Sequence, residues 1–127
     1  MNKINRWNKI SEVAAKQCGR DFVPKVKELA NVNDICNSCQ NYDIVLVAYE
    51  KEEKNTLKNE LSKLKERNNE KIKIGVLIGP EGGLDIKEVE LLEKAGAKII
   101  TLGKRILRTE TVALNVLSNI MYELEEI

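Results

Sequence analysis

The chain has 127 residues, of which 43% are apolar and 32% are charged, so its composition is that of an ordinary globular domain and not of a disordered chain. Its formal net charge of +1 is too small for a protein that binds nucleic acid over its whole surface. The sequence contains no histidine, which excludes a Ser-His-Asp or Cys-His catalytic unit and a histidine-ligated metal. If the chain binds RNA, its small net charge means that it must use a local patch or depend on help from elsewhere.

The length predicts one domain covering residues 1–127. No apolar run approaches the roughly 20 residues of a membrane helix. Residues 1–7 are polar, where a signal peptide has an apolar centre. We therefore expect a soluble, cytoplasmic domain with no membrane partner.

The first part of the chain has a helical pattern over residues 5–17. Apolar or small side chains recur on one face there: Trp7, Ile10, Ala14 and Cys18. Gly19 can end this helix. Residues 22–24 predict a short extended piece, because Pro24 cannot take a central ladder position. Residues 33–39 predict a brief helix.

Strand and helix patterns alternate in the rest of the chain. Three apolar, β-branched runs predict strands: residues 43–49, 71–78 and 97–102. Three segments predict helices: residues 56–67, 85–95 and 109–124. Asp85 and Thr109 can cap the last two helices, and Gly96 can end the first of these. This alternation predicts an α/β fold with a parallel sheet covered by helices on both sides.

The three cysteines leave two interpretations open. Cys36 and Cys39 form a C-x-x-C, which occurs in zinc sites and in redox pairs. A zinc site normally needs a second such pair, and the sequence has none. Small, half-buried thiols in a reducing compartment are the favoured interpretation, and we expect no metal.

Two unusual loops follow the second and third predicted strands, at the ends where open parallel sheets bind ligands. The first is Gly79-Pro80-Glu81-Gly82-Gly83-Leu84, which alone is compatible with a plain strand-to-helix turn. The second runs from Gly103 to Thr111 and reads Gly-Lys-Arg-Ile-Leu-Arg-Thr-Glu-Thr. Its apolar Ile106 and Leu107 stand between two arginines, and loops seldom expose such residues unless something covers them.

These two loops resemble the signature of the SPOUT RNA methyltransferases. The Arg-Ile-Leu-Arg-Thr-Glu-Thr form is similar to that of the RsmE family, which methylates N3 of a uridine in 16S ribosomal RNA. Residues 6–20, with Arg6-Trp7 and Glu12-Val13-Ala14-Ala15-Lys16-Gln17-Cys18-Gly19-Arg20, look like the first helix of the family's catalytic domain. Members normally carry a small β-barrel domain ahead of it, and the resemblance here starts at the catalytic domain.

The resemblance implies a C-terminal trefoil knot whose loops hold S-adenosylmethionine, a homodimer, and 16S ribosomal RNA or the small ribosomal subunit as partner. It implies eight cofactor-binding residues: Ile78, Gly79, Gly82, Leu102, Gly103, Ile106, Leu107 and Ala113. In the last helix, the apolar residues between positions 112 and 124 cover more than one stripe of the surface. Either a partner subunit covers the second stripe, or the helix is buried within the monomer.

By the same resemblance, four residues are candidates for catalysis. Arg108 and Arg20 would stabilise negative charge on the uracil, because a guanidinium stays protonated. Glu81 and Glu110 would accept a proton or orient an arginine. An ion pair of Arg108 with Glu110 that only braces the loop is the alternative. A relative that methylates another RNA position, such as a ribose 2′-hydroxyl, and a non-catalytic nucleotide- or RNA-binding module remain the competing functions.

Overall fold

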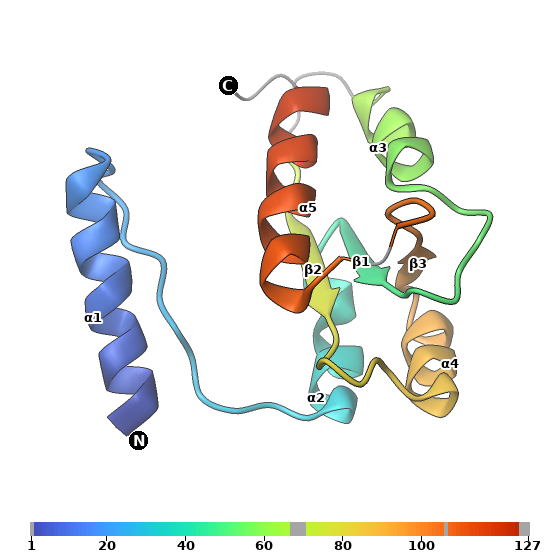
Figure 1. Cartoon of the computed structure of the whole chain (residues 1–127), viewed down its shortest axis with the longest axis horizontal. Helices are drawn as coiled ribbons and strands as arrows, with labels where there is room; N and C mark the ends of the chain where they lie inside the picture. The colour runs from blue at the N-terminus through green and yellow to red at the C-terminus, as the bar shows by residue number, and fades with distance from the viewer. Residues whose placement is uncertain (1, 67–70, 106, 125–127) are drawn as a thin grey trace. The chain divides into compact units, whose positions relative to one another are not determined.

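The chain is described by a computed structural model that covers residues 2–66, 71–105 and 107–124 (Figure 1). It divides into two compact units, Met1–Asn31 and Val32–Ile127, and each is described here by itself. Whether residues 1–127 work as one catalytic domain stays a prediction. No helix in the described ranges is both long and apolar enough to cross a membrane.

The first unit consists of α1 (Asn2–Gln17) and an irregular segment that follows it. Gly19 has a φ of 75°, a left-handed conformation that ends the helix as the sequence predicts. Asn8 ties the segment to the helix, since its side chain donates to the Val26 carbonyl (3.0 Å) and accepts from the Val26 N–H (2.7 Å). The Ser11 hydroxyl donates to the Pro24 carbonyl (2.6 Å).

The second unit is built on a parallel sheet of β1 (Ile44–Ala48), β2 (Ile74–Ile78) and β3 (Lys98–Ile100), in the order β2-β1-β3. The register pairs Ala48 with Ile78 on one side and with Ile100 on the other. All three strands therefore end at the same level. The sequence predicted each strand one to three residues too long at its ends, because ladder pairing stops where the neighbouring strand stops.

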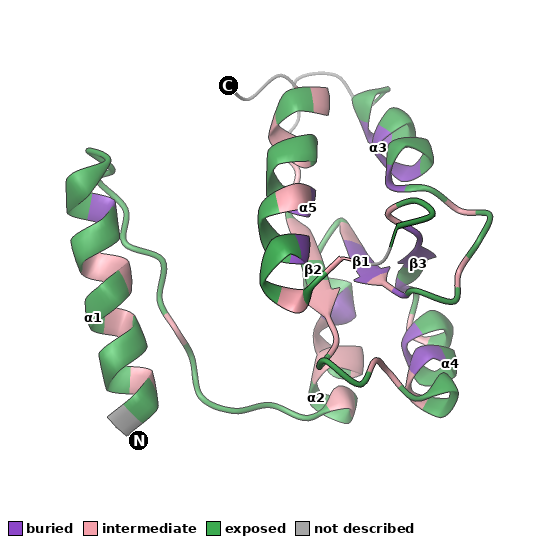
Figure 2. Cartoon of the chain, in the orientation of Figure 1, coloured by how far each residue is buried: buried purple, intermediate pink, exposed green. Residues whose placement is uncertain are grey.

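Helices cover both faces of this sheet, as the sequence predicts (Figures 1 and 2). On one face, Val45 and Val47 pack in a core with α2 (Val32–Ser38), the short η1 (Cys39–Asn41) and α4 (Ile86–Lys94). On the other face, Leu46 and Ile100 pack with α3 (Leu57–Lys65) and α5 (Thr109–Glu123). Adjacent residues of β1 point to opposite faces, so one apolar run supplies both cores.

The helix ends are fixed largely by local chemistry. Asp85 caps α4 in a full capping box with Glu88, and Gly96, with a φ of 103°, follows the helix as predicted. The prediction that Thr109 caps the last helix is wrong. Arg108 is the N-cap residue of α5 and Thr109 is the first helical residue, so no side chain accepts from the helix N–H groups at this cap.

One face of α5 packs on the sheet and a second apolar face does not. Val112 and Val116 are buried, with Ile120 packed beside them. By contrast, Leu114 is 71% exposed and Leu117 is 58% exposed. Within the second unit, α5 is therefore not buried on all sides.

Candidate active site

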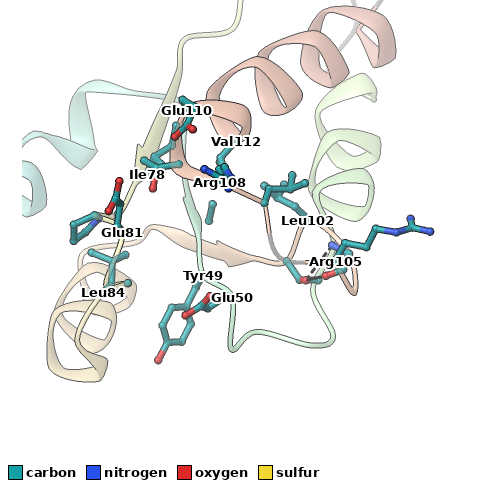
Figure 3. Close-up of a pocket in the computed structure, with 18 of the residues that line it drawn as sticks. Tyr49, Glu50, Ile78, Glu81, Leu84, Leu102, Arg105, Arg108, Glu110 and Val112 are labelled. Carbon is teal, nitrogen blue, oxygen red and sulfur yellow. Dashed lines mark hydrogen bonds between the residues drawn. The ribbon is translucent and has the colours of Figure 1, made fainter.

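A pocket of about 390 Å³ lies where the loops after β1, β2 and β3 meet (Figure 3). Because the three strands are parallel and end at one level, their following loops gather at a single edge of the sheet. The first loop contributes residues 48–50, the second residues 78–81 with 83–84, and the third the described lining residues between 101 and 112. The volume is within the range of pockets that hold small molecules and cofactors.

The loop after β2 is compact and held by glycine. A Cβ on Gly79 would lie 2.8 Å from Cγ of Leu84, so only glycine lets the loop fold back on itself here. The Gly83 N–H donates to the Pro80 carbonyl (2.8 Å) and closes a tight turn in which Gly83 has a φ of 83°. Pro80, with its fixed φ, stiffens the same turn. The result is a rigid wall that carries Glu81 at its exposed tip.

The loop after β3 begins with a second tight arrangement. The Thr101 hydroxyl donates to the Gly103 carbonyl and accepts from the Gly103 N–H, both at 3.2 Å. Gly103 has a φ of 114°, a conformation that side chains disfavour. Gly103 therefore presents backbone without a side chain to the pocket, beside Leu102, and the lining also includes Leu107 and Val112.

Charges of both signs line the pocket. The basic residues are Lys104, Arg105 and Arg108, and the acidic residues are Glu50, Glu81 and Glu110. All six are exposed, and Arg105 extends away from the other labelled side chains (Figure 3). Within the described ranges none of the six forms an ion pair. The alternative of an Arg108–Glu110 brace therefore finds no contact in this structure, and both groups face the pocket.

The N-terminus of α5 also belongs to the pocket, through Thr109 and Glu110. The first N–H groups of a helix have no partner within the helix, and the helix dipole places partial positive charge there. Arg108 offers no side-chain acceptor, and its carbonyl accepts from the Thr111 N–H (2.9 Å), which leaves the N–H groups of Thr109 and Glu110 without an acceptor among the described residues. The arginine and the helix end together favour negative charge at this point of the pocket.

Eight of the twelve residues singled out in the sequence line the pocket. They are Ile78, Gly79, Glu81, Leu102, Gly103, Leu107, Arg108 and Glu110. Gly82 and Ala113 are exposed and are not among the lining residues, since Gly82 is at the tip of its turn and Ala113 points away from the sheet side of α5. Arg20 belongs to the first unit, where its guanidinium is 6.0 Å from the centre of the Phe22 ring. Ile106 lies outside the described residues.

Sequence analysis missed the contribution of the loop after β1. Ala48, Tyr49 and Glu50 line the pocket although no motif marks them. In Figure 3 Tyr49 and Glu50 lie next to each other at one end of the pocket. The signal was available, because the rule that ligands bind beyond the carboxyl ends of parallel strands applies to the first predicted strand as much as to the other two.

Across residues 2–66, 71–105 and 107–124, no group of three or more cysteine or acidic side chains is arranged to hold a metal ion. Cys39 is buried in the core between the sheet and α4. Burial is the main cause that raises the pKa of its thiol, and the charge of the nearby Cys36 raises it further. A protonated thiol is a poor metal ligand and a poor nucleophile.

Comparison with known proteins identifies the family. Residues 1–121 match the family described as RNA methyltransferase domain. The chain belongs to this RNA methyltransferase domain family. The resemblance seen in the two pocket loops is thereby confirmed for nearly the whole chain.

Two curated relatives in this RNA methyltransferase family are named ribosomal RNA small subunit methyltransferase E. The protein from Bacillus subtilis is 37% identical over 123 residues, covering 97% of this chain and 48% of the relative. The protein from Mesomycoplasma hyopneumoniae is 35% identical over 116 residues, covering 91% of this chain and 47% of the relative. The chain thus spans about half the length of the curated relatives it matches.

The solved structure of another protein with this name shares the fold. The crystal structure of ribosomal RNA small subunit methyltransferase E from Neisseria gonorrhoeae, bound to S-adenosylmethionine, aligns with a TM-score of 0.79 at 27% identity. The match covers 95% of this chain and 48% of that one. The α/β architecture described above is therefore that of an RNA methyltransferase with a bound methyl donor.

Proposed function

We propose that this chain binds S-adenosylmethionine and methylates N3 of a uridine in 16S ribosomal RNA. The observation that carries the proposal is the pocket itself. Both loops that resemble the family signature wall one cavity at the carboxyl edge of the sheet. The names of the curated relatives and the donor bound in the Neisseria gonorrhoeae structure support it.

The pocket fits the cofactor in size and in chemistry. A cavity of about 390 Å³ is large enough for an adenosine-sized ligand. The bare backbone at Leu102 and Gly103 can pair with the edge of an adenine, while Ile78 and Leu107 offer apolar contact to its faces. We also assign four further residues to cofactor binding: Gly79, Ile106, Gly82 and Ala113. The last two are positions that flank the pocket. When bound, the cofactor supplies an electrophilic methyl group.

Arg108 and the N-terminus of α5 are assigned to the uracil. Attack by N3 requires the imide proton to leave, so the ring becomes anionic before or during transfer. A guanidinium and unpaired helix N–H groups stabilise that charge in place, where they need no reorganisation. Arg20 is assigned the same role, although it belongs to the first unit.

Glu81 and Glu110 are assigned to the proton. A carboxylate near N3 can accept the imide proton directly or through one water. The N3 electron pair then forms the new carbon–nitrogen bond, and the electron pair of the broken carbon–sulfur bond stays on sulfur. Both carboxylates line the pocket from different loops, so the two assignments can be separated by mutation.

We further propose that the C-terminal part of the chain is threaded as a trefoil knot. The support comes from the path of the chain after β3. β3 is one edge strand and β2 is the other, yet α5 packs against β2 and α3. The loop that joins β3 to α5 therefore returns across the carboxyl end of the central strand.

A homodimer is part of the same proposal. Leu114 and Leu117 are exposed on α5, next to the face that packs on the sheet. An apolar helix face of this kind favours a second copy of the chain as its cover. We place the reaction in the cytoplasm, where the ribosomal RNA is.

The test uses the full chain with small ribosomal subunits, or with 16S RNA, from cells that lack the modification. Transfer of a labelled methyl group should yield 3-methyluridine in the nucleoside digest. In a separate calorimetric measurement without RNA, a chelator should not change the binding of S-adenosylmethionine. A 2′-O-methyl nucleoside would identify a different RNA position. Saturable binding of S-adenosylmethionine without transfer to either RNA substrate would favour the non-catalytic binding module.

A further inference from the structure

A network of hydrogen bonds lies behind the pocket, between the loop after β1, helix α3 and strand β3. Its centre is Asn55, a half-buried residue that does not line the pocket. The segment before it is held by Glu52, whose carboxylate accepts from the backbone N–H groups of Lys54 (3.1 Å) and Asn55 (2.8 Å). The backbone of Asn55 is therefore held in place independently of the contacts of its side chain.

The side chain of Asn55 uses both of its amide hydrogens and its oxygen. Nδ2 donates to Oε2 of Glu60 (2.9 Å) and to the backbone carbonyl of Ile99 (2.9 Å). Oδ1 accepts from Nδ2 of Asn59 (2.8 Å). No other side chain can make this set of bonds from this position. Aspartate has no donor, and glutamine is longer by one methylene group.

Asn55 also bonds to β3 through its backbone. Its carbonyl accepts from the Thr101 N–H at 2.7 Å, and a parallel bridge joins Thr56 to Thr101. The Thr101 hydroxyl in turn holds Gly103 through two contacts of 3.2 Å. A continuous series of hydrogen bonds therefore runs from Asn55 through Thr101 to the pocket wall at Leu102 and Gly103.

The buried carboxylate of Glu60 needs the hydrogen bond from Asn55. Its side chain is 4% exposed, and its partners in the described ranges are the Asn55 amide and, at 3.8 Å, the ammonium of Lys63. A buried carboxylate that loses its hydrogen-bond donor is strongly disfavoured, more so than a neutral group. Removing the Asn55 amide therefore unsettles the start of α3 as well as β3.

We propose that Asn55 is a positioning residue for the cofactor pocket, which fixes the wall at residues 101–103 from behind. This inference rests on the proposed function and deepens it, because it names what holds the donor-binding backbone in place. Asn55 does not line the pocket. Its loss should therefore weaken cofactor binding while leaving the rate at saturating cofactor nearly unchanged.

The test combines a measurement without ligand and one with ligand. The variants are Asn55→Ala, Thr101→Val, and Asn59→Ala as the matched control, which removes one bond to Asn55 but none to β3. Hydrogen–deuterium exchange of the Thr101 and Gly103 amides reports the wall directly. Asn55→Ala keeps the backbone carbonyl that accepts from the Thr101 N–H, but it removes the side-chain bonds to Glu60 and to the Ile99 carbonyl that hold this carbonyl against β3. We therefore expect exchange to rise about tenfold in Asn55→Ala and to stay within about twofold in Asn59→Ala.

With S-adenosylhomocysteine as probe, calorimetry should show binding weakened about tenfold in Asn55→Ala. The KM for S-adenosylmethionine should rise by a similar factor, with kcat within about threefold of the unmodified chain. Affinity and exchange within twofold of the unmodified chain would overturn the inference, as would a loss confined to kcat.

Two outcomes keep the inference separate from folding and from the proposed function. If Asn55→Ala does not fold, Thr101→Val decides, since it removes only the hydroxyl that holds Gly103. Unchanged affinity and unchanged Gly103 exchange in that variant would overturn the inference. If the unmodified chain binds neither ligand, the proposed function fails, and the exchange measurement still decides whether Asn55 holds the wall.

Discussion

Gly82 and Gly83 are neighbours in the loop after β2, but an alanine would strain the backbone only at Gly83. Gly83 has a φ of 83°, whereas Gly82 has no positive φ, and a Cβ there would meet nothing within 4 Å. A left-handed conformation costs an alanine about 1–2 kcal/mol. Replacing glycine by alanine also restricts the unfolded chain, which stabilises the fold by roughly 0.4–1 kcal/mol wherever the backbone is compatible.

The unfolded-state contribution is shared by the two variants, so the difference between them isolates the strain. We expect Gly83→Ala to be less stable than Gly82→Ala by about 1–2 kcal/mol. For a chain of this length, that corresponds to roughly 4–8 °C in melting temperature. Gly82→Ala alone should melt at or slightly above the temperature of the unmodified chain.

The two variants should also differ in ligand binding. A Cβ on Gly83 would make an ordinary contact with Oε1 of exposed Glu50 (3.4 Å), so the strained backbone, and not a clash, is what would disturb this wall of the pocket. Calorimetry with S-adenosylhomocysteine should therefore show weaker binding for Gly83→Ala than for Gly82→Ala, which keeps its backbone conformation. Equal melting temperatures for the two variants would refute the strain argument, and equal affinities would show that this wall does not contact the cofactor.

Three further predictions follow from the pocket, the exposed helix face and the core. Arg108→Ala should lower the rate of methyl transfer about 10²–10³-fold with little change in affinity for S-adenosylmethionine, because the charge of Arg108 is needed only when the uracil is anionic. Equal losses in rate and affinity would mean that Arg108 only supports the loop structurally. Leu117→Glu should give monomers in sedimentation, whereas Asn119→Glu, at an exposed position on a different face of α5, should not. An unmodified chain that is already monomeric at micromolar concentration would contradict the dimer. Cys39 should resist iodoacetamide at pH 8 while exposed Cys18 reacts, because burial raises the pKa of the Cys39 thiol. The stability that its neutral form contributes is present below the ordinary thiol pKa and is lost as the pH rises through the raised pKa. Equal labelling of both thiols in the folded chain would contradict the burial argument.

Much of the fold follows from local sequence patterns. The run at residues 43–49 is apolar without alternation, and β1 does pack on both faces. Asp85 and Gly96 mark the ends of α4 because capping and left-handed glycine are local chemistry. Thr109 shows the limit of this reasoning, because its side chain suits a cap, but the path of the chain out of the pocket places Arg108 at that position.

The pocket is a harder case, because its residues meet only through long-range pairing. Pro80 and its neighbouring glycines stand out in the sequence, and they do form one wall. Tyr49 and Glu50 carry no such mark, and their place depends on β1 being the central strand. Asn55 is a common polar residue in a loop, so only the hydrogen bonds to Glu60 and Ile99 reveal its position behind the wall.

The third strand, β3, is three residues long and forms one edge of the sheet, yet its following loop supplies much of the pocket. Short edge strands are among the first segments to exchange their amides in a folded domain. Fraying of β3 would dismantle the binding site while both hydrophobic cores persisted in large part. A ligand that binds only the closed state therefore adds its stability chiefly to this strand, and the protection of its amides should grow with ligand concentration well before the midpoint of global unfolding moves.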